Sequence, residues 1–203
     1  MTTRAGYVAL VGKPNVGKST LLNAFTGEKL SIVSVRAQTT RERVMGIWTG
    51  EDRQMVFVDT PGLLEPRYLL QHSMLQAART AVSDSDVVLL LLDGTDPDAS
   101  LPDEAATALL RRRAGVLVVA VNKTDVAAAA DVAALRSAAS DRFDADAFEV
   151  SATSGAGVVA LRDALGNALP LSPFLYPEDD LAVQPVRFFV AELVRETVFE
   201  EYA

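Results

Sequence analysis

The sequence contains no cysteine, so the chain can form neither a disulfide framework nor a thiolate metal site. It also has no long apolar segment. The longest apolar run, Val87–Leu92, is far shorter than the roughly 20 residues that a membrane-spanning helix requires. The N-terminus lacks the basic and then apolar pattern of a secretion signal. These absences predict a cytoplasmic protein, and they leave open a peripheral contact with the inner membrane.

A surplus of positive charge is missing as well. Lys and Arg together number 19 against 27 for Asp and Glu, which gives a formal net charge of −8 at pH 7. Because phosphate backbones are held mainly by surplus Lys and Arg, this balance argues against nucleic-acid binding by the whole chain, although a local basic patch stays compatible with it. The 203 residues, 49% of them hydrophobic, predict one well-packed domain with a remainder, and we expect a monomer.

Short apolar runs alternate with helical patterns along most of the chain. The runs are too short for helices and rich in Val and Leu, which is typical of buried strands in a parallel sheet. The predicted strands are Tyr7–Val11, Met55–Val58, Val87–Leu92 and Val116–Val121, with a weaker one at Ala147–Val150. The predicted helices are about Lys18–Phe25, Leu69–Val82, Asp103–Arg113, Val132–Ala139 and Val158–Leu169. This alternation predicts a three-layer α/β domain.

One pair of segments departs from the alternation. Val44–Thr49 and Gln54–Val58 are separated only by Gly50–Arg53, a connection that suits a β-hairpin. The first of these segments is therefore predicted to be an antiparallel edge strand. The expected sheet is mostly parallel and has about six strands.

The composition changes after Leu169. Four prolines, at positions 170, 173, 177 and 185, fall close to the acidic run Glu178–Asp180, which is typical of a linker. Beyond it, Val186–Tyr202 places apolar residues at helical spacing. We therefore expect a first domain over residues 1–170, a linker over 171–185 and a helix over 186–203, which either folds back on the first domain or opens a second one.

The strongest motif lies between the first predicted strand and the first predicted helix. Residues 12–19 read Gly-Lys-Pro-Asn-Val-Gly-Lys-Ser, which fits the phosphate-binding pattern G-x-x-x-x-G-K-[ST] in the strand–loop–helix context that the pattern requires. Gly12 and Gly17 let the backbone bend around a phosphate chain, Lys18 neutralises phosphate oxygens and Ser19 can ligate Mg²⁺. The loop predicts binding of a nucleoside triphosphate.

A second segment, Asp59-Thr60-Pro61-Gly62, closes an apolar strand. An open α/β sheet places its ligands at the carboxyl ends of its strands, where this segment is expected. Asp59 would hold Mg²⁺ through water, and the Gly62 amide would meet the γ-phosphate. The same four residues also suit an ordinary turn, so this prediction depends on their place after the phosphate loop.

A third segment predicts which base is bound: residues 122–125 read Asn-Lys-Thr-Asp. Guanine presents an N1–H and an N2 amine that one carboxylate can accept together, whereas adenine has neither. We expect a buried Asp125 to select guanine, because an unpaired carboxylate is unfavourable. Lys123 can lay its aliphatic stem along the base, and Asn122 can tie the loop to its neighbours. Val150–Ala152 offers a backbone amide for guanine O6, although such a sequence is common in loops.

Together these residues resemble the Era GTPases, a family of small GTPases of the translational class. The resemblance covers nearly the whole chain, because the three segments and Val150–Ala152 stand in the order found in that family. Its most specific parts are the core Ala37-Gln38-Thr39-Thr40-Arg41 within Ser31–Arg43, and Pro14–Asn23, which reads Pro-Asn-Val-Gly-Lys-Ser-Thr-Leu-Leu-Asn. The resemblance implies a P-loop NTPase G domain that binds GTP or GDP with Mg²⁺ and hydrolyses GTP.

The resemblance also implies the residues of the site. Mg²⁺ would be ligated by Ser19, Asp59 and a switch threonine, which we assign to Thr40 with Thr39 as the alternative. The catalytic residues would be Asn15, Lys18, Thr40 and Gly62. The nucleotide would be bound by Gly12, Lys13, Pro14, Asn15, Val16, Gly17, Lys18, Ser19, Thr20, Asp59, Thr60, Pro61, Gly62, Asn122, Lys123, Asp125, Ser151 and Ala152.

Hydrolysis is expected to be slow. Many GTPases place a glutamine after the Asp-x-x-Gly turn to position the attacking water, but Leu63 occupies that place here. In related GTPases without the glutamine, an asparagine at the position of Asn15 helps to hold K⁺ against the phosphates, so Asn15 is a candidate K⁺ ligand. The alternative is that Asn15 only forms the turn next to Pro14.

The resemblance implies a role in assembly of the small (30S) ribosomal subunit, with 16S rRNA bound by a second, KH-type domain. A KH domain clamps RNA with a Gly-x-x-Gly loop, yet no glycine follows Gly166. We therefore expect residues 186–203 to be the first helix of a KH-type domain whose remainder this chain lacks. The missing loop argues against direct RNA binding by the chain.

Two other functions stay open. One is a nucleotide-sensing interaction module with negligible turnover, which the hydrophobic Leu63 allows. The other is a different ribosome-assembly GTPase of the same class, such as one with two tandem GTPase domains, against which the single phosphate loop weighs.

Overall fold

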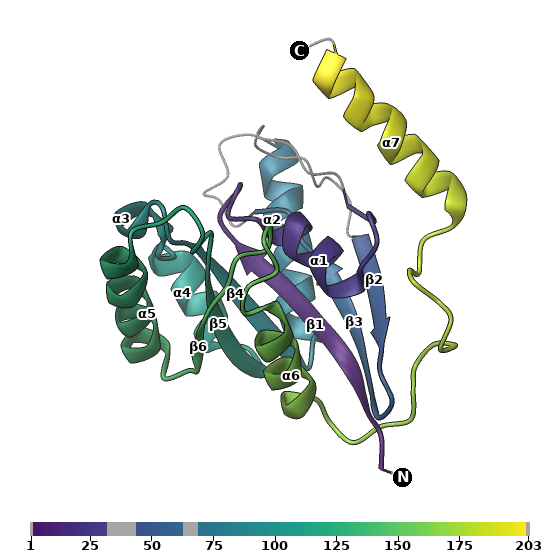
Figure 1. Cartoon of the computed structure of the whole chain (residues 1–203), viewed down its shortest axis with the longest axis horizontal. Helices are drawn as coiled ribbons and strands as arrows, with labels where there is room; N and C mark the ends of the chain where they lie inside the picture. The colour runs from purple at the N-terminus through teal and green to yellow at the C-terminus, as the bar shows by residue number, and fades with distance from the viewer. Residues whose placement is uncertain (1, 32–43, 63–68, 202–203) are drawn as a thin grey trace.

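The computed structural model of the chain describes residues 2–31, 44–62 and 69–201. Its centre is one six-stranded sheet with the order β2-β3-β1-β4-β5-β6 (Figure 1). Neighbouring strands are parallel except β2 and β3, which form the predicted antiparallel hairpin. The predicted fold class is therefore confirmed. The strands are β1 (Arg4–Gly12), β2 (Val44–Thr49), β3 (Arg53–Asp59), β4 (Val87–Asp93), β5 (Val116–Asn122) and β6 (Ala147–Glu149).

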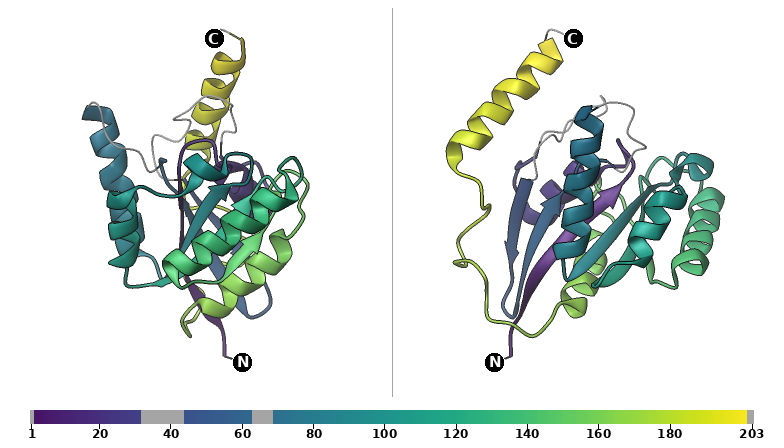
Figure 2. Two further views of the ribbon diagram at one scale, coloured as in Figure 1. Left: turned by 90° about the vertical axis from the view of Figure 1, so that its left-hand side faces the viewer. Right: turned by 180° about the vertical axis from the view of Figure 1, so that it is seen from behind.

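Helices cover both faces of the sheet and create two hydrophobic cores. On one face, α1 (Lys18–Thr26) and α6 (Val158–Ala168) pack against alternate strand residues, with Phe25 stacked on Phe57 at 4.5 Å between ring centroids. On the other face lie α2 (Leu69–Asp84), α4 (Glu104–Arg111) and α5 (Ala129–Phe143) (Figure 2). Because both faces are buried, the central strands read as continuous apolar runs.

Some helix boundaries differ from those predicted. A short helix, α3 (Pro97–Ser100), was not predicted, and α4 ends at Arg111 rather than 113. Asp103 lies outside α4 as its N-cap and accepts a hydrogen bond from the Ala106 amide at 2.8 Å. The predicted helix at Val132–Ala139 extends over Ala129–Phe143, because flanking alanines favour helix without adding to the apolar periodicity.

The segment from 170 to 185 runs along the free edge of the sheet. The Ile47 amide donates to the Leu181 carbonyl at 2.8 Å, and the Val183 amide donates to the Met45 carbonyl at 3.2 Å. The side chain of Gln54, fully buried, holds the same segment at Leu175 and Tyr176. This stretch, predicted as a linker, therefore lies as a strap on β2 and β3.

The last helix, α7 (Val186–Glu201), extends beyond the edge of the sheet (Figure 1). Near its start, Phe188 and Phe189 pack against the core on the α1 and α6 side. Most of its described apolar side chains are exposed, namely Val186, Val190, Leu193, Val194 and Val198. The helix therefore folds back on the first domain only at its first turns. No helix within the described ranges has the length and apolarity needed to cross a membrane.

Candidate nucleotide-binding site

The predicted segments converge on one edge of the sheet. The parallel strands end there at Gly12, Asp59, Asp93, Asn122 and Glu149. Strand register places Gly12 opposite Leu91 and Asp93 opposite Asn122. Since open α/β sheets bind ligands at the carboxyl ends of their strands, this edge is the candidate site.

The two glycines of the phosphate loop have backbone conformations that only glycine tolerates well. Gly12 has φ +153°, and a Cβ there would lie 2.5 Å from the Leu91 carbonyl oxygen. Gly17, the N-cap of α1, has φ +99°, and its Cβ would lie 2.3 Å from the side-chain nitrogen of Asn122. Between them Asn15 adopts the left-handed conformation, with φ +62°. The loop therefore has the tight backbone path on which the prediction rests.

Lys18 begins α1 and is buried beneath the loop. Its ammonium donates to the backbone carbonyls of Lys13 at 2.9 Å and Gly12 at 3.2 Å. Burial disfavours its charged form and lowers its pKa to about 8, although the negative charge of Asp59 opposes this shift. A polyanion on the loop would stabilise the ammonium, so the position suits phosphate binding.

Asn122, at the end of β5, joins three of the predicted segments. Its side-chain nitrogen donates to the Val16 carbonyl at 2.8 Å, and its oxygen accepts from the Ala152 amide at 2.9 Å. Asn122 is buried, as are Val16 and Ala152. The expected tie between the phosphate loop, the 122–125 segment and Val150–Ala152 is therefore present.

Asp59 and Ser19 supply the oxygen atoms expected of a Mg²⁺ site. The Ser19 hydroxyl donates to Asp59 Oδ2 at 2.7 Å, and Asp59 is fully buried. One carboxylate and a hydroxyl beside a phosphate loop suit Mg²⁺, which is usually held by few protein ligands together with phosphates and water. Within the described ranges, no cluster of three or more His, Cys, Asp or Glu could hold a metal ion.

The rest of the Asp59–Gly62 segment is fixed against the phosphate loop and β1. The Thr60 hydroxyl donates to the Leu10 carbonyl at 2.7 Å. A Cβ on Gly62 would lie 2.7 Å from the Pro14 nitrogen, so only glycine allows this close approach. The turn therefore lies directly beside the loop, as its predicted role requires.

Lys123 and Asp125 follow Asn122 at the end of β5. Lys123 has φ +64°, and its ammonium pairs with Asp93 Oδ2 at 2.5 Å. Asp125 is exposed, which corrects the expectation of a buried carboxylate. The reason is local: residues 124–126 form a turn beyond the sheet edge, which leaves this side chain in contact with solvent.

The backbone amides of Ser151 and Ala152 already have partners within the protein. The Ser151 amide donates to the Ala156 carbonyl at 2.9 Å, and the Ala152 amide donates to Asn122. Thr20, also a predicted contact, lies half-buried in the first turn of α1. The predicted switch residues Thr39 and Thr40, the core Ala37–Arg41 and Leu63 lie outside the described residues.

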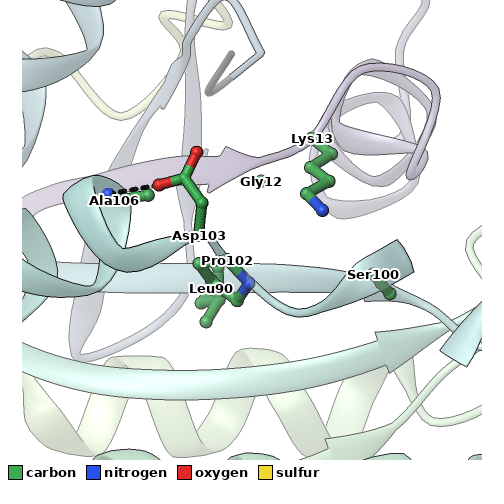
Figure 3. A pocket seen from close by; sticks show the side chains of 7 residues that line it. All are labelled: Gly12, Lys13, Leu90, Ser100, Pro102, Asp103 and Ala106. Carbon is green, nitrogen blue, oxygen red and sulfur yellow. Dashed lines mark hydrogen bonds between the residues drawn. The ribbon is translucent and has the colours of Figure 1, made fainter. Parts of the chain in front are cut away.

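The segment after β4 is a part of the site that sequence analysis missed. The Lys13 ammonium contacts the Ala99 carbonyl, and Asp93 pairs with Lys123, so this segment touches both the phosphate loop and residues 122–125, the turn predicted to select the base and called the base-selecting turn below. A small cavity lies between the segment after β4 and the phosphate loop (Figure 3). It is lined by Gly12, Lys13, Leu90, Ser100, Pro102, Asp103 and Ala106. The available signal was Asp93 itself, a carboxylate that follows an apolar strand as Asp59 does.

Burial would by itself raise the pKa of Asp93. Hydrogen bonds from Lys123 and from the hydroxyl and amide of Thr95 outweigh burial and hold the pKa below its ordinary value. Asp93 is therefore ionised at neutral pH, in an ion pair with Lys123.

Comparison with known proteins places these features in a family. The family described as "50S ribosome-binding GTPase" matches residues 7–123. The chain is 41% identical to the GTPase Era of Bradyrhizobium diazoefficiens over 203 residues, which cover 98% of this chain and 65% of that protein. It is 39% identical to the GTPase Era of Thermotoga maritima over 201 residues, covering 98% of this chain and 67% of that protein. The chain thus spans about two thirds of the length of these curated relatives.

Two solved structures have nearly the same fold. One is a single-residue variant of Aquifex aeolicus Era bound to GDP·AlF4⁻, with a TM-score of 0.89, 35% identity and coverage of 98% of this chain and 68% of that chain. The other is Era in complex with MgGDPNP and nucleotides 1506–1542 of 16S ribosomal RNA. Its TM-score is 0.87 at 35% identity, with coverage of 97% of this chain and 67% of that chain.

Proposed function

Because this chain belongs to the Era family of GTPases, we propose that it binds GTP and GDP with Mg²⁺ and hydrolyses GTP slowly. One observation carries the proposal: the two hydrogen bonds of Asn122 hold the phosphate loop, the base-selecting turn and Val150–Ala152 together at one edge of the sheet. Such an arrangement suits a ligand with both a phosphate chain and a base.

In this proposal the phosphates lie on the loop from Gly12 to Thr20. Lys18 supplies positive charge, and the loop amides and the start of α1 supply hydrogen-bond donors. Mg²⁺ would be held by Ser19, Asp59 and a switch threonine, Thr40 or Thr39, and would neutralise charge on the phosphate oxygens. Gly62, next to Pro14, is placed to offer its amide to the terminal phosphate.

The base would be recognised at the end of β5. We assign guanine selection to Asp125, whose exposed carboxylate is open to a ligand. A bound base would remove Asp125 from water, so an adenine in its place would leave the carboxylate unpaired. The Ala152 amide, which donates to Asn122, would take part only by sharing its hydrogen with guanine O6.

Base selection is tested by changing one group on the protein, the Asp125 carboxylate, and one group on the base, the N2 amine of guanine. The wild-type chain is expected to bind GDP at least about 100-fold more tightly than ADP, since a buried unpaired charge costs several kcal/mol. Asp125→Asn replaces an acceptor with a donor, so this variant should prefer xanthosine diphosphate, which carries an oxygen where guanine has its N2 amine. Equal binding of GDP and ADP by the wild type would refute the assignment.

Hydrolysis is tested separately from binding. We expect slow release of phosphate from GTP in Mg²⁺ buffer and faster release when K⁺ replaces Na⁺, with Asn15→Ala removing the K⁺ effect but not GDP binding. Equal rates in K⁺ and Na⁺ would leave Asn15 as a turn residue only. Tight GTP binding with no turnover, even with K⁺ and small ribosomal subunits, would instead favour the nucleotide-sensing module.

We further propose a role in assembly of the 30S subunit in the cytoplasm. The support is the family membership and the relative solved with 16S rRNA nucleotides, while the net charge of −8 and the absence of a glycine after Gly166 argue against RNA contact by this chain alone. Residues 1–170 would act as the G domain, 171–185 as its linker, and 186–203 as the first helix of a KH-type domain. Co-sedimentation with 30S subunits in GTP and in GDP tests this role, and a peripheral membrane contact is tested by vesicle flotation.

A further inference from the structure

The contact between Asp93 and Lys123 links β4 to the base-selecting turn. Asp93 is the last residue of β4 and lies opposite Asn122 in the strand register. Its Oδ2 accepts a hydrogen bond from the Lys123 ammonium at 2.5 Å. The side chains are 15% and 33% exposed, respectively, so this ion pair is more shielded from water than an ordinary surface pair.

The carboxylate of Asp93 is itself held in place. Its Oδ1 accepts from the Thr95 amide at 3.0 Å and from the Thr95 hydroxyl at 2.6 Å. The backbone amide of Asp93 donates to the Ser100 hydroxyl at 2.5 Å. Ser100 is buried, and the Asp96 carboxylate caps the short helix that contains it. Asp93 is therefore a fixed anchor, whereas a lysine side chain by itself has four freely rotating bonds.

We propose that Asp93 is a positioning residue for guanine recognition, which holds the Lys123 ammonium at the end of β4 so that the aliphatic stem of Lys123 is fixed for contact with the base. The inference rests on the proposed GTP-binding function. Ordering a long side chain opposes ligand binding, and an anchor that orders it beforehand removes that cost. The left-handed backbone of Lys123 points to the same requirement for a defined lysine position.

This role has a specific signature. Loss of Asp93 should weaken ligands that carry a base and leave inorganic pyrophosphate, which has none, unaffected. In hydrolysis, KM for GTP should rise while kcat stays the same, because the base makes the same contacts before and during phosphoryl transfer. A merely structural role for Asp93 would weaken pyrophosphate and GDP alike.

The experiment measures dissociation constants of GDP and Mg²⁺-pyrophosphate for the wild type, Asp93→Ala, Lys123→Met and the double variant. We expect Asp93→Ala to weaken GDP about three- to tenfold, the equivalent of one ordered side chain, without changing pyrophosphate binding. In the Lys123→Met background the Asp93 substitution should add nothing, since its partner is gone. Additive effects in the double variant, or equal losses for GDP and pyrophosphate, would overturn the inference.

Three further variants make the result unambiguous. Asp93→Asn keeps an oxygen for Thr95 but has no negative charge for Lys123, so it should weaken GDP even if Asp93→Ala does not fold, and Asp93→Glu should restore part of the affinity. Asp52→Ala removes a carboxylate from a surface ion pair with Arg53 in the β2–β3 hairpin, at the opposite end of the sheet, and should bind GDP as the wild type does. If the wild type itself failed to prefer GDP over ADP, the proposed function would fail first, independently of Asp93.

Discussion

The side chain of Asn122 donates a hydrogen bond to the Val16 carbonyl across 2.8 Å, which joins the base-selecting turn to the phosphate loop. The same side chain accepts from the Ala152 amide, and all of these atoms are buried. One residue thus holds together segments that are more than 100 positions apart in the sequence. Loop positions that are fixed in advance favour ligand binding because less ordering is needed when the ligand arrives.

Substitution of Asn122 by alanine should therefore affect both stability and binding. Two buried backbone groups lose their partners, so we expect the free energy of unfolding to fall by about 2–4 kcal/mol. GDP affinity should fall as well, because the two loops are no longer joined. Urea denaturation and GDP titration measure the two effects. Asn167→Ala, which changes an exposed asparagine in α6, is the matched control and should alter neither quantity.

Gly17 should tolerate no side chain. An alanine there would have φ +99° and a Cβ 2.3 Å from the Asn122 side chain, so Gly17→Ala is expected to abolish detectable GDP binding. Gly27→Ala is the control, since Gly27 also has a positive φ of +76° but no atom within 4 Å of its Cβ position. It should cost only about 1–2 kcal/mol of stability and leave binding intact. Wild-type binding by Gly17→Ala would contradict the steric argument.

Ser19 should matter only when Mg²⁺ is present. Its hydroxyl lies beside Asp59, where a Mg²⁺ ligand is expected. Ser19→Ala should bind GDP like the wild type in EDTA and should lose most of the gain in affinity that Mg²⁺ provides. Ser31 also donates to Asp59, at 3.2 Å, and belongs to no predicted ligand set. Ser31→Ala should therefore keep the Mg²⁺ effect. If instead Ser31→Ala lost the effect and Ser19→Ala kept it, the Mg²⁺ ligand would be Ser31 and not Ser19.

The buried Lys18 predicts a pH dependence of opposite sign for stability and for binding. Burial lowers its pKa from 10.5 to about 8, so between these values the unfolded chain binds more protons than the folded chain, and stability of the free protein rises with pH. Only the charged form attracts phosphate, so GDP affinity should be level below pH 8 and fall above it by up to about tenfold per pH unit.

Calorimetry of GDP binding in EDTA checks the Lys18 prediction without a metal ion. Above pH 8 the protein should take up close to one proton as it binds, a value obtained by comparing buffers of different ionisation enthalpy. Lys18→Met, which cannot titrate, should bind weakly with no proton uptake. Uptake that is the same in the wild type and in this variant would assign the titration to another group.

Much of this site follows from local patterns, and the remainder depends on contacts that such patterns do not encode. The Gly12–Ser19 loop and the Asp59 turn were predictable because strand, turn and helix signals adjoin them in sequence. The bridging by Asn122 was predicted only in general form, as a tie between its loop and neighbouring segments, and its two partners were not named. The ion pair of Asp93 with Lys123 joins two strand ends 30 residues apart and needed the strand order, which the sequence left undetermined.

The exposure of Asp125 was predicted wrongly for a related reason. Base selection requires a desolvated carboxylate, but in the chain by itself the turn after β5 projects into solvent. In the proposed complex a bound base would cover this carboxylate, which the chain by itself leaves exposed. The helix α3 was missed because four residues are too few to show a helical period, although Asp96 and Pro97 are typical of a helix start.

Gln54 should control whether the strap from 170 to 185 stays on the sheet. Its side-chain oxygen accepts from the amides of Leu175 at 2.7 Å and Tyr176 at 3.0 Å, and its nitrogen donates to the Tyr176 carbonyl at 2.9 Å and to the Thr49 hydroxyl at 3.1 Å. Gln54→Leu has a similar volume but makes none of these bonds. The backbone amides and carbonyl of the strap that Gln54 holds would then lack partners in the protein and would form hydrogen bonds with water instead.

Limited digestion with chymotrypsin tests this, because the enzyme cleaves after aromatic residues and leucine and the strap contains Phe174, Leu175 and Leu181, none of which precedes a proline. Gln54→Leu should be cut there at least about tenfold faster than the wild type, which corresponds to a loss of about 1.4 kcal/mol or more in strap attachment. Gln76→Leu, at an exposed position of α2, should be cut at the wild-type rate. Equal cleavage rates in all three proteins would mean that the pairing of the strap with β2, and not Gln54, holds it in place.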